Sequence, residues 1–180
     1  MNKNNSIVAI YTSHTDAEAA VKELQRSGFD MKKLSIVGRD FRSDEHVVGY
    51  YNMGDRMKYW GTLGAGVGAF WGGLWGLLVG SAIFWVPGLG PTLVAGPLVS
   101  WIVGALEGGV LIGGIDAIGA GLYSLGIPKD SIVKYETALK ADKFVLIAHG
   151  SAAETTRAQG IINGTSPETM ECHQPELISV

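Results

Sequence analysis

Short apolar runs alternate with amphipathic stretches over the first 51 residues of the chain. Residues 7–11 form a run of β-formers that is followed by turn residues, which predicts a strand. Over residues 17–27 apolar side chains recur at helical spacing and charged side chains fill the other positions, so an amphipathic helix is expected to end at Gly28. Residues 34–38 and 46–51 predict two further strands.

The same kinds of pattern return in the last third of the chain. Pro128 suits the start of a helix, and apolar positions continue at helical spacing to Leu139. Residues 144–148 are five consecutive apolar positions and predict a buried strand. A last helix is expected over residues 152–162, whereas the tail, residues 165–180, contains two prolines and is expected to be loose.

These elements, without the segment between them, predict an α+β fold with the ferredoxin-like order βαββαβ and an extra C-terminal helix. Residues 1–58 and 126–164 are then two halves of one domain, residues 59–125 are an insertion, and residues 165–180 are a flexible tail. Because both halves complete one sheet, an insertion that crosses a membrane must cross it an even number of times.

The insertion is almost free of charge. Between Lys58 and Glu107 the only ionisable side chain is a tyrosine. Residues 60–86 and 98–125 each exceed the roughly 20 residues that a helix needs to cross a bilayer core. The proline- and glycine-rich residues 87–97 separate them. We therefore expect an apolar, glycine-rich helical hairpin that enters a bilayer.

Small residues recur every four positions along both predicted helices. Positions i and i+4 share one helix face, so the small residues form a stripe that allows close approach of another helix. Glycine weakens a helix in water by about 1 kcal/mol relative to alanine, whereas in lipid a broken backbone hydrogen bond costs more. The expected packing residues are Gly64, Gly68, Gly72, Gly76 and Gly80, followed by Ala105, Gly109, Gly113, Ala117 and Gly121. Either the hairpin partner or another copy can fill this stripe.

Three tryptophans lie near the ends of the predicted helices, as expected for side chains at a membrane interface. The alternative is that they pack against the glycines of a neighbouring helix. They are Trp60, Trp85 and Trp101. Two acidic residues, Glu107 and Asp116, lie in the second predicted helix, where an acid at membrane depth costs about 2–3 kcal/mol. They mark an ion path, or they are protonated or hydrogen-bonded to a neighbouring helix.

The charge and the cysteine content of the chain exclude some classes of function and indicate its compartment. A net charge of −3 without a dense basic patch argues against nucleic-acid binding. The single cysteine, Cys172, excludes an intrachain disulfide and fits the cytoplasm. The first residues lack the apolar core of a signal peptide. The glycines of residues 64–68 do not follow a buried strand, so a dinucleotide site is not expected there.

Sequence motifs for catalysis are missing. There is no phosphate loop, CxxC pair, HExxH or GxSxG. The four histidines are dispersed, and Cys172 with His173 is an isolated pair in the tail. We therefore expect no catalytic residue, metal, cofactor or small-molecule substrate.

The stretch GIPKDSIVKYETALKADKF at residues 126–144, with the opening strand and the glycine-rich centre, resembles bacterial heat-induced or general stress proteins that carry an internal glycine-zipper hairpin. The resemblance covers about residues 5–160, and the tail has no counterpart. It implies a stress-responsive protein for which no catalytic residues are established.

The main hypothesis is a non-enzymatic protein of the cytoplasmic (inner) membrane, with both termini in the cytoplasm. Its partners would be the lipid bilayer and other copies of itself, bound through the glycine faces. The first alternative is a soluble homo-oligomer, such as a ring, filament or shell, in which the hairpins bury one another. The second is an ion or proton channel that uses Glu107.

Overall fold

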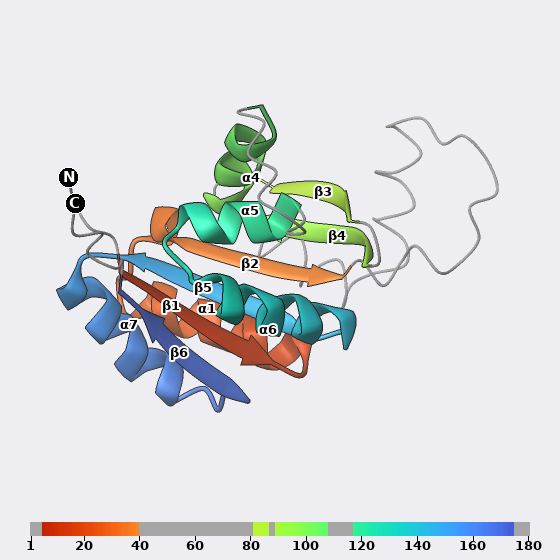
Figure 1. Cartoon of the computed structure of the whole chain (residues 1–180). Coiled ribbons are helices and arrows are strands. Elements are labelled where there is room, and N and C mark those ends of the chain that lie inside the picture. Colours follow the sequence, from red (N-terminus) through yellow and green to blue (C-terminus); the bar gives the residue numbers. More distant parts are fainter. Residues whose placement is uncertain (1–4, 40–80, 87–88, 108–116, 175–180) are drawn as a thin grey trace, which may run out of the picture.

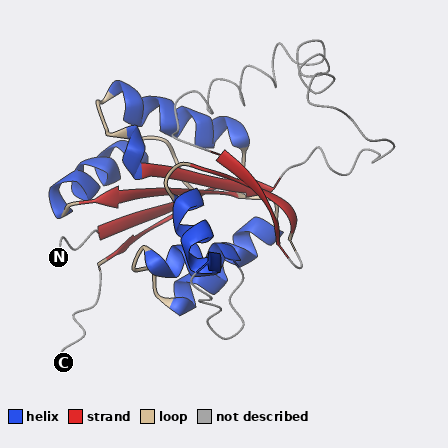
Figure 2. Cartoon of the chain, turned by 90° about the horizontal axis from the view of Figure 1, so that it is seen from above, coloured by secondary structure: helices blue, strands red, loops and turns tan. Residues whose placement is uncertain are grey.

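The computed structural model describes residues 5–39, 81–86, 89–107 and 117–174, and in them one sheet carries helices on both faces (Figures 1 and 2). The strands are β1 (Asn5–Tyr11), β2 (Leu34–Arg39), β3 (Ser81–Val86), β4 (Gly90–Ala95), β5 (Phe144–Gly150) and β6 (Thr169–His173). The helices are α1 (His14–Arg26), a short 3₁₀ turn η1 (Met31–Lys33), α4 (Leu98–Glu107), α5 (Ala117–Ser124), α6 (Lys129–Lys140) and α7 (Ala152–Asn163). The strand order is β3-β4-β2-β5-β1-β6, and every neighbouring pair is antiparallel.

β5 lies near the middle of the sheet, between β1 and β2, and all seven of its residues are buried. Val8 of β1 is paired with Ile147, and Leu34 of β2 is paired with Ala148. Side chains alternate along a strand, so a strand that is buried at every position needs a cover on both faces.

The first cover consists of α1 and α7. The buried residues of α1 follow a helical stripe, and they are Ala17, Ala20, Val21 and Leu24. They pack with Ile7, Leu34 and Leu146 of the sheet and with Ala158 and Ile162 of α7. Ser13 caps the start of α1, and Ser151 with Glu154 forms a capping box at the start of α7.

The second cover consists of α4, α5 and α6. Leu98 and Ile102 of α4, Ile118 and Leu122 of α5, and Ile132 and Leu139 of α6 pack in one buried cluster. The sheet contributes Val8, Ile10, Val37, Val145 and Ile147 to the same cluster. The residues from α4 to α6 thus bury the face of the sheet that α1 and α7 leave open.

The join between β4 and α4 fits closely against β2. Gly96 has φ +92°, a conformation that favours glycine, and a Cβ at this position would collide with the carbonyl oxygen of Leu34 and lie 2.8 Å from Cα of Ser35. The buried hydroxyl of Ser35 accepts a hydrogen bond from the backbone N–H of Leu98 at 3.1 Å, at the start of α4. This side chain ties the second helical layer to the sheet.

The mixed α+β fold is confirmed. The predicted strands at 7–11, 34–38 and 144–148 correspond to β1, β2 and β5, and the predicted helices correspond to α1, α6 and α7. The expected strand at 46–51 lies outside the described residues. The ferredoxin-like assignment had paired the helix after residue 127 with the first helix, whereas α6 covers the opposite face of the sheet from α1.

The predicted helical hairpin is wrong where the structure describes it. Residues 81–86, expected to end the first helix, form β3, and most of the expected break at 87–97 is β4. The second predicted helix, 98–125, is divided into α4 and α5. Aliphatic and aromatic side chains suit a strand that pairs in a sheet, and the pairing of Val86 with Gly90 closes a β-hairpin here. Among the described helices, none combines the length and apolar character that crossing a bilayer requires.

The expectation of a loose tail is wrong for the described residues 165–174, because residues 169–173 pair with β1 as an edge strand. The backbone N–H of Glu168 donates to the carbonyl oxygen of Ile10 at 2.8 Å, and the Tyr11 hydroxyl lies 2.8 Å from that of Thr165. These long-range bonds order a segment whose own composition is polar.

Replacing Gly96 with alanine is expected to lower the free energy of unfolding by about 2–4 kcal/mol, because backbone strain adds to the collision with β2. Gly90→Ala is the matched control, since Gly90 has φ +78° but open space around its Cα, and about 1 kcal/mol is expected. Urea unfolding of both variants measures the difference. Equal losses would show that the join does not press against β2.

Candidate functional site

The described surface exposes four large hydrophobic side chains, and three of them belong to α4 and α5. Trp101 and Val103 of α4 are 41% and 39% exposed, and Tyr123 of α5 is 44% exposed. The fourth, Val133, stands on α6. We call Trp101, Val103 and Tyr123 the α4–α5 face; Trp101 and Val103 are two positions apart in α4 and lie on different flanks of that helix.

The sequence of α4 explains why this face is apolar. Leu98 and Ile102 are buried against the sheet, and apolar Trp101 and Val103 are exposed on the two flanks of this stripe. The positions opposite the stripe are the exposed Ser100 and Gly104, which carry no charge. No charged residue occurs in α4 before Glu107. A surface helix of a water-exposed protein usually places charged residues opposite its buried stripe. The uncharged outer side of α4 with its apolar flanks therefore suits contact with an apolar surface.

A small residue sets the distance between α4 and α5. A Cβ on Gly121 of α5 would lie 2.6 Å from Cγ1 of Ile102 and 3.1 Å from Cδ1 of Leu98. Glycine at this position allows the two helices to pack at short range. The two helices that contribute to the α4–α5 face therefore pack tightly against each other.

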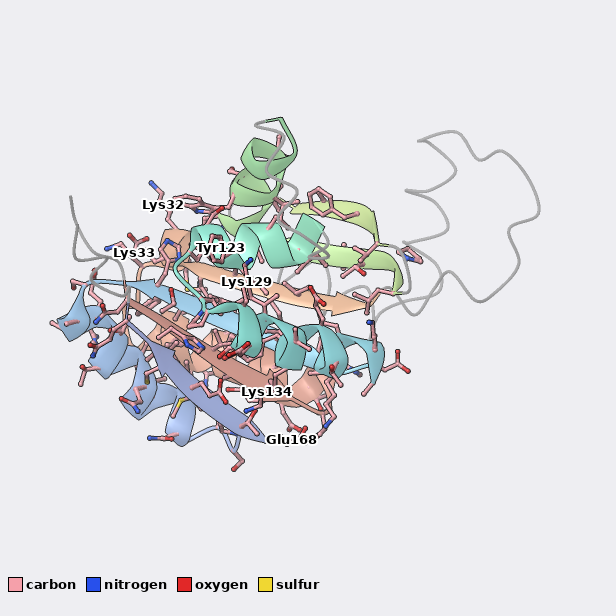
Figure 3. All side chains as sticks on the ribbon, in the orientation of Figure 1. Lys32, Lys33, Tyr123, Lys129, Lys134 and Glu168 are labelled. Carbon is pink, nitrogen blue, oxygen red and sulfur yellow. The ribbon has the colours of Figure 1, made fainter. Side chains whose placement is uncertain are left out.

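A cation lies beside the aromatic part of the face. The Lys129 ammonium group is 6.0 Å from the centre of the Tyr123 ring, at the outer limit of a cation–π contact, and Figure 3 labels both side chains. Lys129 and Tyr123 are both exposed. An apolar face with an amphipathic tyrosine and a lysine at its border resembles the residue distribution at a membrane–water interface.

The structure places only some of the predicted site residues. Trp101, Ala105 and Glu107 belong to α4, Ala117 and Gly121 belong to α5, and Trp85 belongs to β3. The remainder lie outside the described residues: Trp60, Gly64, Gly68, Gly72, Gly76, Gly80, Gly109, Gly113 and Asp116. The second stripe of small residues does not follow one helix, because Ala105 and Gly121 belong to different helices.

Sequence reasoning missed Val103 and Tyr123. The uncharged run from residue 98 to residue 106 was a signal that the exposed positions of α4 carry no charge. The exposure of Tyr123 depends on how α5 packs against α4 and α6, which periodicity alone does not determine.

The histidines and the cysteine do not form a metal site within the described part of the chain, where no group of three or more His, Cys, Asp or Glu side chains is suitably placed. Cys172 and His173 are neighbours along β6, so their side chains point to opposite faces of the sheet. His149 of β5 is buried, its Nδ1 has no hydrogen-bond partner among the described residues, and burial lowers the pKa of its ring. His46 lies outside the described residues.

Comparison with known families gives one match. Residues 6–83 match the model of the heat induced stress protein YflT domain. The match supports a stress protein family. It extends from β1 to within β3, and the distinctive stretch at residues 126–144 lies beyond it. Neither the curated proteins nor the solved structures include a match to this chain.

We expect Gly121→Ala to destabilise the protein by about 1–3 kcal/mol, because the added methyl group overpacks the contact between α5 and Ile102. Gly104→Ala in α4 is the control, since a Cβ at Gly104 meets no atom within 4 Å. This control should stabilise the protein by about 0.5–1 kcal/mol through helix propensity. Thermal or urea unfolding of the two variants provides the comparison, and a Gly121→Ala protein as stable as the control would contradict the close packing.

Proposed function

We propose that this chain is a non-enzymatic, stress-associated protein that attaches to the surface of a lipid bilayer through the α4–α5 face. The observation that carries the proposal is that Trp101 and Val103 are exposed on α4, a helix without a charged residue before its last position. The match to a heat-induced stress protein domain supports the stress-associated role.

The chemistry of the face suits the interfacial region of a bilayer. Tryptophan and tyrosine prefer this depth because each has an apolar ring and a polar group. Lys129, next to Tyr123, would meet anionic headgroups, and a basic side chain near such a surface contributes about 1 kcal/mol. The half-exposed Trp101, Val103 and Tyr123 would add about 1 kcal/mol each on burial. A total of a few kcal/mol corresponds to weak, reversible binding by one copy.

Surface attachment fits the described strands better than a hairpin that spans the membrane. β2 ends at Arg39, β3 begins at Ser81, and both strands belong to one sheet. A crossing between them would have to be followed by a second crossing back. Two helical crossings need about 40 apolar residues. The uncharged run between Lys58 and Ser81 has the length of only one.

The proposed location is the cytoplasmic face of the inner membrane, with both termini in the cytoplasm. The displayed domain would be a ferredoxin-like unit made of β1–α1–β2 and β5–α7–β6. Its support is the strand order β6-β1-β5-β2 with α1 and α7 on one face of the sheet.

A second candidate function is self-association in water, and the edge strand β3 favours it. β3 has the sequence SAIFWV, without charge or proline, and among the described strands it pairs with β4 alone. The opposite edge, β6, carries Glu171. Uncharged apolar edge strands are typical places for pairing with another chain. Assembly without lipid in a sizing experiment would favour this candidate.

Vesicle flotation tests the lipid proposal. The wild-type protein should float with vesicles of phosphatidylcholine and phosphatidylglycerol. A Trp101→Glu, Val103→Glu double variant should lose at least tenfold in partitioning, which corresponds to about 1.4 kcal/mol. Val133→Glu is the matched control, because Val133 is 60% exposed but belongs to α6, and it should float like the wild type.

Two results would contradict the proposal. A wild-type protein that stays at the bottom of the gradient with both neutral and anionic vesicles would remove lipid as the partner. Equal flotation of the double variant and the wild type would show that binding uses another surface.

A further inference from the structure

A buried polar network joins α6 to the edge strand β6. The Tyr135 hydroxyl donates a hydrogen bond to Oε2 of Glu171 at 2.8 Å and lies 2.6 Å from Nε2 of His173. Lys134, the neighbour of Tyr135 on α6, forms an ion pair with the same Glu171 carboxylate. Tyr135 is 1% exposed and His173 is 8% exposed, so these two side chains are shielded from water, whereas Glu171 and Lys134 are partly exposed.

β6 has few apolar contacts that would hold it without this network. Met170 is its one partly buried hydrophobic residue in the core between the sheet and the α1–α7 layer. The segment before it is held by polar groups: Lys143 binds Glu168 at 2.6 Å, and Thr165 lies against the Tyr11 hydroxyl. Hydrogen bonds and exposed ion pairs contribute only about 1 kcal/mol or less each. Besides its backbone pairing with β1, the attachment of β6 therefore rests on its buried polar residue, His173.

The burial of His173 favours a neutral imidazole. The hydroxyl of Tyr135 has one proton and donates it to Glu171, so its oxygen accepts from Nε2–H of His173, a bond that the neutral and the protonated ring both make. A second proton would create a charge in a site that is shielded from water. Ser6 of β1, opposite His173 in the ladder, is neutral and donates its hydroxyl proton to the carbonyl oxygen of Leu125.

The charged groups around His173 come from its own strand and from α6. Glu171 lies 3.8 Å from Nε2 and would stabilise an imidazolium, but Lys134 already binds this carboxylate. Burial lowers the pKa of His173, Glu171 raises it and Lys134 lowers it again, with burial the largest effect. Lys134 thus opposes the compensation that Glu171 gives.

We infer that β6 is an acid-released strap: protonation of His173 detaches it from α6 and from the edge of β1. The neutral ring suits the attached state, whereas a water-exposed ring accepts a proton near its ordinary pKa of about 6.5. Because the pKa of attached His173 is lowered, attachment is strongest above about pH 6.5 and weakens as the pH falls below that value. Release would uncover the backbone hydrogen-bonding edge of β1.

Glu171 cannot supply the first step of this release. Its pKa is lowered, mainly by the hydrogen bond from Lys134, so its contribution to attachment is lost only below the ordinary range of a glutamate. Burial raises the pKa of Tyr135, which stays protonated throughout. His149 is the second described buried histidine, but it belongs to β5, which is paired on both sides, so its protonation would not free β6.

Hydrogen exchange followed by mass spectrometry tests the strap. Protection factors, corrected for the intrinsic pH dependence of exchange, are compared at about pH 7.5 and about pH 5.5. In the wild type the β6 amides should lose protection at the lower pH, by at most tenfold per pH unit, while those of β2 and β5 keep theirs. His173→Phe should abolish this pH dependence, and His149→Phe should retain it.

Unchanged protection of β6 in the wild type at both values would overturn the inference, as would the same loss in His173→Phe. NMR titration of His173 in Lys134→Met provides an independent test if the phenylalanine variant does not keep β6 attached. Without Lys134, the Glu171 carboxylate should favour the imidazolium, so the titration midpoint of His173 should rise above that of the wild type. An unchanged midpoint would count against the network.

Discussion

Burial of β5 on both faces is the constraint on which the rest of this structure depends. β5 carries apolar side chains at five consecutive positions, Phe144 to Ala148, and it lies between two other apolar strands. One helical layer, α1 with α7, covers only three of these side chains, those of Phe144, Leu146 and Ala148. The other two, Val145 and Ile147, would face water without α4, α5 and α6. Each such side chain contributes about 1.5–3 kcal/mol when it is removed from water, so the second layer is essential to the stability of the domain.

This constraint gives the apolar insertion a role that composition alone did not suggest. Long apolar runs suit either a bilayer or a protein interior, and residues 98–125 were assigned to a bilayer because of their length. In the structure the inner sides of α4 and α5 cover the sheet, and Trp101 and Val103 of α4 and Tyr123 of α5 are exposed. A helix that packs on the sheet with one side and exposes apolar, uncharged residues elsewhere is suited to the surface of a membrane, which is why we propose the function there.

Local patterns predicted the parts of the fold with clear periodicity. The strands β1, β2 and β5 and the helices α1, α6 and α7 were found because their patterns and end signals agree. β3 was missed because a short uncharged run suits helix and strand equally, and the glycine spacing before it favoured a helix. β6 was missed because its order depends on distant partners, Tyr135 above all.

Of the candidate face, Trp101 was singled out from sequence, while the exposure of Val103 and Tyr123 could be seen only from the packing of α4 against α5. The lack of alternation in β1 and β5 did carry the missing information, since strands covered on one face alone should alternate.

The most direct test of this account is a backbone NMR measurement of the β2–β4 and β3–β4 pairings in the full chain. If the segment after residue 80 belongs to the sheet, cross-strand contacts will connect Val37 with Val94 and Ala82 with Val94, in the antiparallel register of the structure. Contacts of helical spacing through residues 81–86, without any cross-strand contact to β4, would contradict it. That result would return these residues to the apolar helical hairpin that the sequence first indicated.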